Sequence, residues 1–119
     1  MKKCLLAIAI ACVATPAIAQ SFPGNLVAEY YMNEFSIPKG WTLSYQGKDG
    51  STEVFVMDRD LDAFPQTSFL QPIDQIRRVM CGDENLKAVV NGGTVIRVDA
   101  RDKQNGKIKV TKGAKLERC

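Results

Sequence analysis

The stretch TVIRVDARDKQNGKIKVT, residues 94–111, decides the fold of this chain. Its apolar side chains Ile96, Val98 and Ala100 alternate with the charged Arg97, Asp99 and Arg101, as in a strand with one buried face. Asn105 and Gly106 favour a tight turn, and the alternation resumes after that turn. The stretch therefore predicts a β-hairpin in which Ile108 and Val110 point inward.

A second hairpin is predicted upstream, over residues 41–57, where aromatic and β-branched residues surround a glycine-rich turn. Apolar residues at helical spacing predict a first helix over 25–35 and a second one over 69–80. Asp83 is a candidate N-cap for a short third helix that ends near Asn91. We expect an α+β fold, with a four-stranded antiparallel or mixed sheet, two to three helices packed on it and one disulfide.

The first 19 residues have the features of a secretory signal peptide: two lysines, an apolar run and then Ala17-Ile18-Ala19. Cleavage is expected between Ala19 and Gln20, which leaves residues 20–119 as a single small domain. An alternative is lipidation of Cys12, because Ala11-Cys12 resembles the end of a lipobox. The expected location is the periplasm or the medium, with an outer-membrane lipoprotein anchored through Cys12 as the alternative. No integral membrane segment is expected after cleavage.

Two cysteines, Cys81 and Cys119, follow the predicted leader. An exported protein enters a compartment in which disulfides form and persist, so these two residues are expected to pair. A catalytic thiol is not expected, because the chain has neither a Cys-x-x-Cys motif nor a histidine that could activate one.

Composition removes several classes of function. The 119 residues contain no histidine, which excludes serine triads with a histidine base and histidine metal sites. After the leader, the chain has 14 basic residues (16 minus Lys2 and Lys3) and 13 acidic ones. A net charge so close to zero does not favour nucleic-acid binding. Asp58, Asp60 and Asp62 are spaced like calcium ligands, but they lack the glycine and the distal glutamate of a calcium loop. We expect no catalytic, metal or cofactor residues.

Two surfaces are candidates for contact with a partner. Basic residues gather near the C-terminus and would suit an anionic partner or a solvated edge strand: Lys103, Lys107, Lys109, Lys112, Lys115 and Arg118. Aromatic side chains would suit either the core or a groove for a partner's helix or strand. The candidate groove residues are Tyr31, Trp41, Tyr45 and Phe55.

The C-terminal half resembles that of the AspS-type pilotins of the type II secretion system. The resemblance rests on VMCGDENL (79–86), NGGTVIRV (91–98), Asn105-Gly106-Lys107 and Cys119. It implies a one-disulfide α/β domain whose groove holds a C-terminal helix of a secretin subunit and guides it to the outer membrane. Such pilotins are typically lipoproteins, and the leader of this chain differs from theirs in favouring cleavage after Ala19.

The sequence thus predicts an exported, non-enzymatic module that binds another envelope or secreted protein. An accessory of an envelope secretion or conjugation machine would fit this description. The alternative is a secreted inhibitor or immunity-type protein that blocks a partner enzyme, with residues 58–67 as its inhibitory loop.

Overall fold

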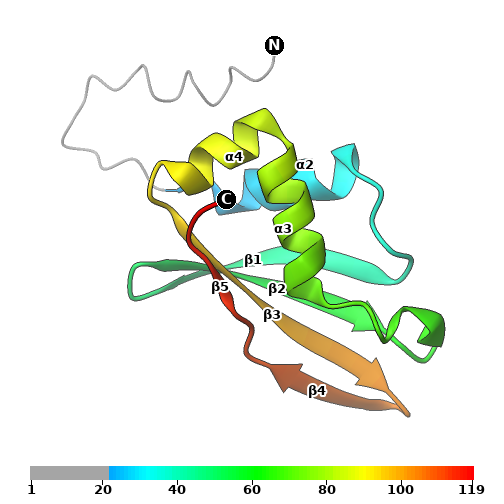
Figure 1. Ribbon diagram of the computed structural model, residues 1–119. Coiled ribbons are helices and arrows are strands. Elements are labelled where there is room, and N and C mark those ends of the chain that lie inside the picture. Colours follow the sequence, from blue (N-terminus) through cyan, green and yellow to red (C-terminus); the bar gives the residue numbers. More distant parts are fainter. Residues whose placement is uncertain (1–21) are drawn as a thin grey trace.

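Two hairpins form the body of the sheet (Figure 1). The structure is a computed structural model that describes residues 22–119. Strands β1 (Trp41–Asp49) and β2 (Thr52–Asp60) are antiparallel, as are β3 (Val95–Gln104) and β4 (Lys107–Thr111). The predicted signal peptide, its cleavage site at Ala19-Gln20 and the alternative lipidation site at Cys12 lie outside the described residues.

The two hairpins are joined through a parallel pairing of β2 with β3, which makes the sheet mixed. Parallel neighbours need a long crossover, and here it contains the short helix η2 (Pro65–Thr67), α3 (Pro72–Gly82) and α4 (Glu84–Asn91). The carboxylate of Asp83 caps α4 by accepting from the backbone N–H of Leu86 at 3.1 Å. Helix α2 (Gly24–Glu34) precedes β1.

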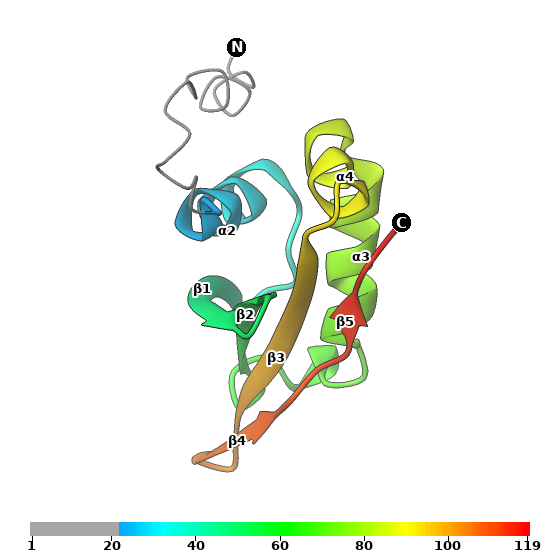
Figure 2. The same cartoon turned by 90° about the vertical axis from the view of Figure 1, so that its left-hand side faces the viewer.

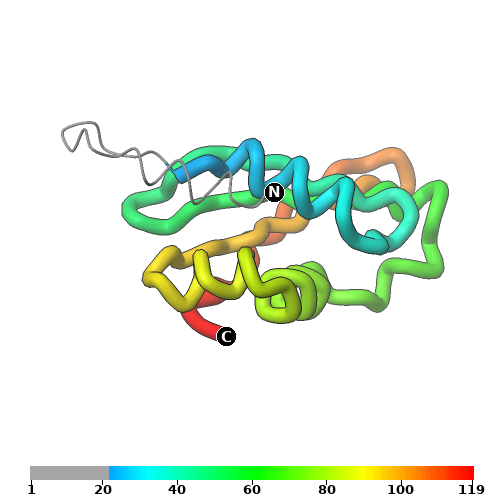
Figure 3. The backbone as a smooth tube through the Cα atoms, turned by 90° about the horizontal axis from the view of Figure 1, so that it is seen from above, coloured from blue at the N-terminus to red at the C-terminus, as the bar shows by residue number. Residues whose placement is uncertain are grey.

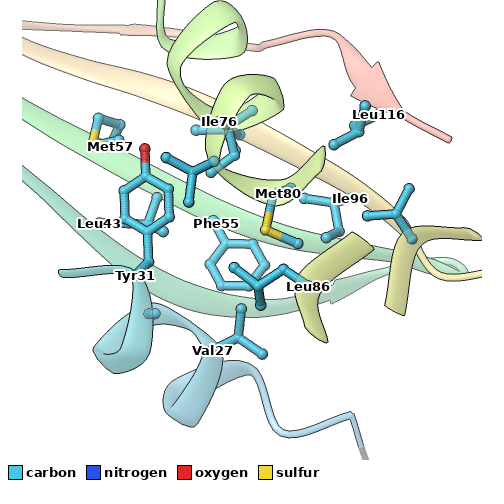
Figure 4. Packing of buried hydrophobic residues seen from close by; sticks show 14 of the residues in the cluster. Val27, Tyr31, Leu43, Phe55, Met57, Ile76, Met80, Leu86, Ile96 and Leu116 are labelled. Atoms are coloured by element: carbon cyan, nitrogen blue, oxygen red, sulfur yellow. The ribbon is translucent and has the colours of Figure 1, made fainter. Parts of the chain in front are cut away.

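The three α-helices of the described residues cover the same face of the sheet (Figure 2). Seen from above, α2 lies over β1 and β2, whereas α3 and α4 lie beside it over β3 (Figure 3). The core fills the space between these two layers (Figure 4). Its largest fully buried side chains are Tyr31, Phe55, Met57, Ile76, Met80, Val90, Ile96 and Leu116.

The other face of the sheet is covered by its own arginines. Arg97 on β3 reaches across β2 to Asp49 on β1, at 2.8 Å, and also pairs with its neighbour Asp99 at 2.9 Å. Val54 and Val56 share this face of β2 and are buried, although no helix within residues 22–119 lies over them. Long side chains that lie along a sheet can shield apolar residues in this way. Around Arg97, from β1 to β3, this face is therefore charged at its surface and apolar beneath.

The chain returns to β3 after β4, in a fifth strand that the sequence did not predict. β5 (Lys115–Leu116) pairs with Arg97 and Ile96, and the Leu116 side chain enters the core. Gly113 permits this return, because a Cβ atom there would collide with the backbone carbonyl of Val98.

The disulfide closes the structure at the end of this tail. Cys119 is bonded to Cys81 in the last turn of α3, with 5.4 Å between the Cα atoms. The predicted α+β fold and disulfide are thus confirmed, and of the two sheet types expected, antiparallel or mixed, the structure has the mixed one, with β5 added to the four strands predicted. Within the described residues, no helix is long and apolar enough to cross a bilayer.

Candidate functional site

The aromatic residues expected to line a groove lie mostly in the core. Tyr31, Trp41 and Phe55 are buried, because they extend from α2 and from the helix-facing sides of β1 and β2. Burial raises the pKa of Tyr31, so its hydroxyl stays neutral. Only Tyr45 of this set reaches the surface, and its hydroxyl donates to Glu53 at 2.5 Å. That bond raises the pKa of Tyr45 to about 12. These four residues do not form an open aromatic groove.

The aspartates that resemble a calcium loop are bound to groups of the protein itself. Asp58 pairs with Arg101, and Asp60 accepts the backbone N–H groups of its own turn. Asp62 accepts the N–H groups of Asn105 and Gly106 at 2.6 and 3.0 Å, and these bonds lower its pKa. Within residues 22–119, no cluster of three or more acidic or cysteine side chains could hold a metal ion. Of these three aspartates, Asp62 organises the β3–β4 turn.

The turn between β3 and β4 has the geometry that its sequence predicts. Asn105 and Gly106 have φ angles of 57° and 73°, the left-handed conformation of a tight hairpin turn. Because Asp62 binds both backbone N–H groups of this turn, the tip of the hairpin is fixed to the end of β2.

β4 is an exposed edge of the sheet, and all five of its residues are exposed (Figure 1). The prediction that Ile108 and Val110 point inward is wrong: their exposed fractions are 60% and 63%. They lie opposite Lys103 and Arg101, on the sheet face away from α2, α3 and α4. The alternation along β4 identifies two faces correctly, but neither face is buried, because β4 extends beyond the helices.

The basic residues near the C-terminus are only partly on this edge: Lys107 and Lys109 belong to β4 and Lys103 lies opposite Ile108, whereas Lys115 lies in β5 and Arg118 precedes the disulfide-bonded Cys119. Among the described residues, none of the six predicted for anionic contact belongs to an ion pair: Lys103, Lys107, Lys109, Lys112, Lys115 and Arg118. We define the cationic edge as β4 with Lys103. It combines exposed backbone, two apolar side chains and unpaired positive charge.

Asp102 would be the natural partner of the cationic edge, because it lies directly opposite Lys109. Its two carboxylate oxygens instead accept from Nε and Nη2 of Arg59, at 2.7 and 2.8 Å. Arg59 is buried, donates from Nη1 to the Leu70 carbonyl and stacks on the ring of Trp41. The Asp102 carboxylate thus pairs with the buried guanidinium of Arg59, so it does not neutralise Lys109.

Two hollows lie beside α3. The first, about 440 Å³, is bounded by Ile37, Pro38, Phe69 and Leu70 together with polar residues of α3. Phe69 is 75% exposed at its rim. The second, about 360 Å³, lies between the start of α3 and residues 111–114, and Arg59 and Asp102 are among its lining residues. The four aromatic residues proposed from the sequence line neither hollow.

Comparisons with protein-family models, with curated proteins and with solved structures found no match to this chain. The function must therefore be argued from the site alone.

Replacing Asp99 by Asn is expected to weaken the acid sensitivity of the fold. Burial opposes ionisation of Asp99, but Arg97 and the Gly113 N–H outweigh it and lower its pKa. A carboxylate with a lowered pKa stabilises the fold above about pH 4 and loses this effect as the pH falls through its folded pKa. Asp99→Asn should cost about 1–2 kcal/mol at pH 7 and flatten the fall in melting temperature below pH 4. Thermal unfolding of the natural protein and of the variant from pH 7 to pH 2 measures the loss of stability and its pH dependence. If the melting temperatures of the two proteins fell in parallel with pH, Asp99 would not be the source of the acid sensitivity.

Proposed function

We propose that this protein is an exported, non-enzymatic binding module that pairs an extended segment of another envelope or secreted protein with the cationic edge. The observation that carries the proposal is β4 itself: a sheet edge with all five residues exposed, two of them apolar. Soluble proteins usually cover or shorten such edges, because an open edge invites another strand to pair with it.

Strand addition gives binding energy through main-chain hydrogen bonds and specificity through alternate side chains. β4 can provide both, because its backbone has β3 on one side and its side chains alternate between apolar and cationic. Five residues span roughly 17 Å of strand, enough for a short linear segment. Before β4, Asp62 fixes the turn by accepting its backbone N–H groups. After β4, the N–H of Gly113 donates to the Asp99 carboxylate at 2.9 Å. The edge is held at both ends before any partner arrives.

An accessory role in an envelope secretion or conjugation machine is one form of this function. The resemblance to pilotins adds a second docking mode, in which a helix of the partner occupies a groove. The partner's helix would occupy the first of the two hollows beside α3, where Ile37, Phe69 and Leu70 offer apolar contacts.

An inhibitor of a partner enzyme is the alternative, and the exposed Phe69 favours it. Residues 58–67 do not form a protruding loop. They begin within β2, Leu61 is buried, and Thr67 accepts a hydrogen bond from the Trp41 indole at 3.1 Å. An inhibitor would therefore present Phe69, just beyond this segment, to its target.

Site-specific photocrosslinking in the cells that make the protein tests these functions against each other. A photoreactive residue is placed at Val110 on the edge, at Phe69 on the rim, or at Lys87 as an exposed control on α4. The proposal expects a discrete protein adduct from position 110 and none from position 87. An adduct from position 69 alone would favour the inhibitor, and equal adducts from all three positions would contradict a specific edge.

A further inference from the structure

We infer that the segment bound by the cationic edge is acidic, with Asp or Glu at every second residue and apolar side chains between them. This inference rests on the proposed function and specifies the chemistry of the partner. Three observations support it. The two faces of β4 differ in chemistry, the carboxylates near its lysines are already bound to other groups of the protein, and pairing between the β4 strands of two copies would place like charges together.

The two faces of β4 differ in chemistry. Lys107, Lys109 and Thr111 lie on the helix-facing side of the sheet, whereas Ile108 and Val110 lie on the opposite side. Side chains directly opposite one another on paired strands are in contact, and opposite charges or two apolar groups stabilise such pairs. A strand added to β4 is therefore bound most tightly when its own side chains also alternate between charged and apolar. Its carboxylates would then lie opposite the lysines, and its apolar side chains opposite Ile108 and Val110.

The protein does not itself neutralise these lysines. Lys109 lies opposite Asp102, whose carboxylate is bound to Arg59, and Lys107 lies opposite the neutral Gln104. Asp62, at the adjacent turn, is occupied by two backbone N–H groups. Each nearby carboxylate thus has an internal partner, and the charge of the edge is available to an incoming segment.

A second copy of the chain fits this edge poorly. Antiparallel pairing of two β4 strands centred on Lys109 would place that lysine opposite itself, and centring on Ile108 would place Lys107 opposite Lys109. Centring on Val110 would set Ile108 against Lys112 and lose an apolar pair. Like charges directly opposite each other destabilise a sheet, so the lysines disfavour self-association and favour an acidic partner.

The test uses three capped ten-residue peptides that alternate Val with Glu, Val with Gln or Val with Lys. Binding to the disulfide-bonded protein is measured by fluorescence anisotropy, and amide chemical shifts locate the contact. The Val-Glu peptide should bind about tenfold more tightly than the Val-Gln peptide, as expected for two opposite-charge pairs. It should shift the amide signals of residues 107–111 and weaken as salt is raised. The Val-Lys peptide should bind least.

A charge-reversed variant makes the test specific. Lys107→Glu/Lys109→Glu should invert the order, so that the Val-Lys peptide binds best. The matched control, Lys39→Glu/Lys87→Glu, makes the same change in net charge at exposed positions away from β4 and should leave the order unchanged. Both variants alter only exposed side chains, so both should melt close to the natural protein, and thermal unfolding of each checks that it is folded.

Three outcomes would overturn the inference. Equal affinity for the Val-Glu and Val-Gln peptides, with shifts in β4, would show an edge that binds strands without preference for acid, and the proposed function would stand. Shifts in β4 that depend on protein concentration alone would show that a second copy occupies the edge. Absence of any peptide contact at β4 would also overturn it, and photocrosslinking would then decide the proposed function separately.

Discussion

Replacing both Cys81 and Cys119 by Ser is expected to lower the free energy of unfolding by about 4 kcal/mol. The bond joins residues separated by 38 positions and so restricts a large part of the unfolded chain. It also holds the tail in place, because Leu116 is buried only as long as β5 remains on β3. For a domain of this size, such a loss is a large fraction of the total stability.

Urea unfolding of the double variant beside the oxidised and reduced natural protein measures this effect. The double variant should unfold at the same urea concentration as the reduced protein, because both lack the crosslink. The slope of the free energy of unfolding against urea concentration distinguishes a change in stability from a change in the unfolded state. An unchanged midpoint in the double variant would mean that packing alone holds the tail.

Replacing Arg59 by Leu is expected to cost about 3 kcal/mol, because it leaves the Asp102 carboxylate without its partner inside the fold. Arg59 makes two short bonds to Asp102 and one to the Leu70 carbonyl at 2.8 Å, and it stacks on Trp41 at 5.0 Å. These contacts join the segment before α3 to the end of the sheet.

The double variant Arg59→Leu/Asp102→Leu provides the control. Removing both charges together is far less costly than removing one, so the double variant should regain most of the lost stability. Melting temperatures of the two single variants and the double variant complete the cycle. If the two single losses simply add, the pair does not contribute as described. Arg59→Leu should also weaken binding of the acidic peptide, because the freed Asp102 carboxylate would then face Lys109.

Sequence patterns predicted the regular elements because each is encoded locally. Both hairpins, the three helices and the pairing of Cys81 with Cys119 follow from periodicity, turn residues and cysteine count, and the structure contains them. β5 was missed because a two-residue strand has no detectable period. Its only signal was Leu116, a lone apolar residue in a basic tail.

The candidate site was less accessible to sequence reasoning, because alternation separates two faces without showing what covers them. The alternation predicts that Ile108 and Val110 point inward, but both are exposed, and the charged run over 58–67 predicts a loop, but Arg59 lies in β2 and is buried. Arg59 shares its strand face with Phe55 and Met57, and this parity could have placed it toward the helices. The choice between core and groove for the aromatic residues depends on helix packing, which is not a local property.

The Cys81–Cys119 bond also determines how the molecule responds to force. In the proposed complex, a partner strand that is pulled away from β4 would transmit tension through Gly113 and β5 to Cys119. Cys119 is covalently joined to Cys81 in α3, so the segment from β5 to Cys119 is anchored by a bond that resists its peeling from β3. Under load, the hydrogen bonds between a partner strand and β4 should therefore break before the fold opens, which would make the proposed binding reversible under force.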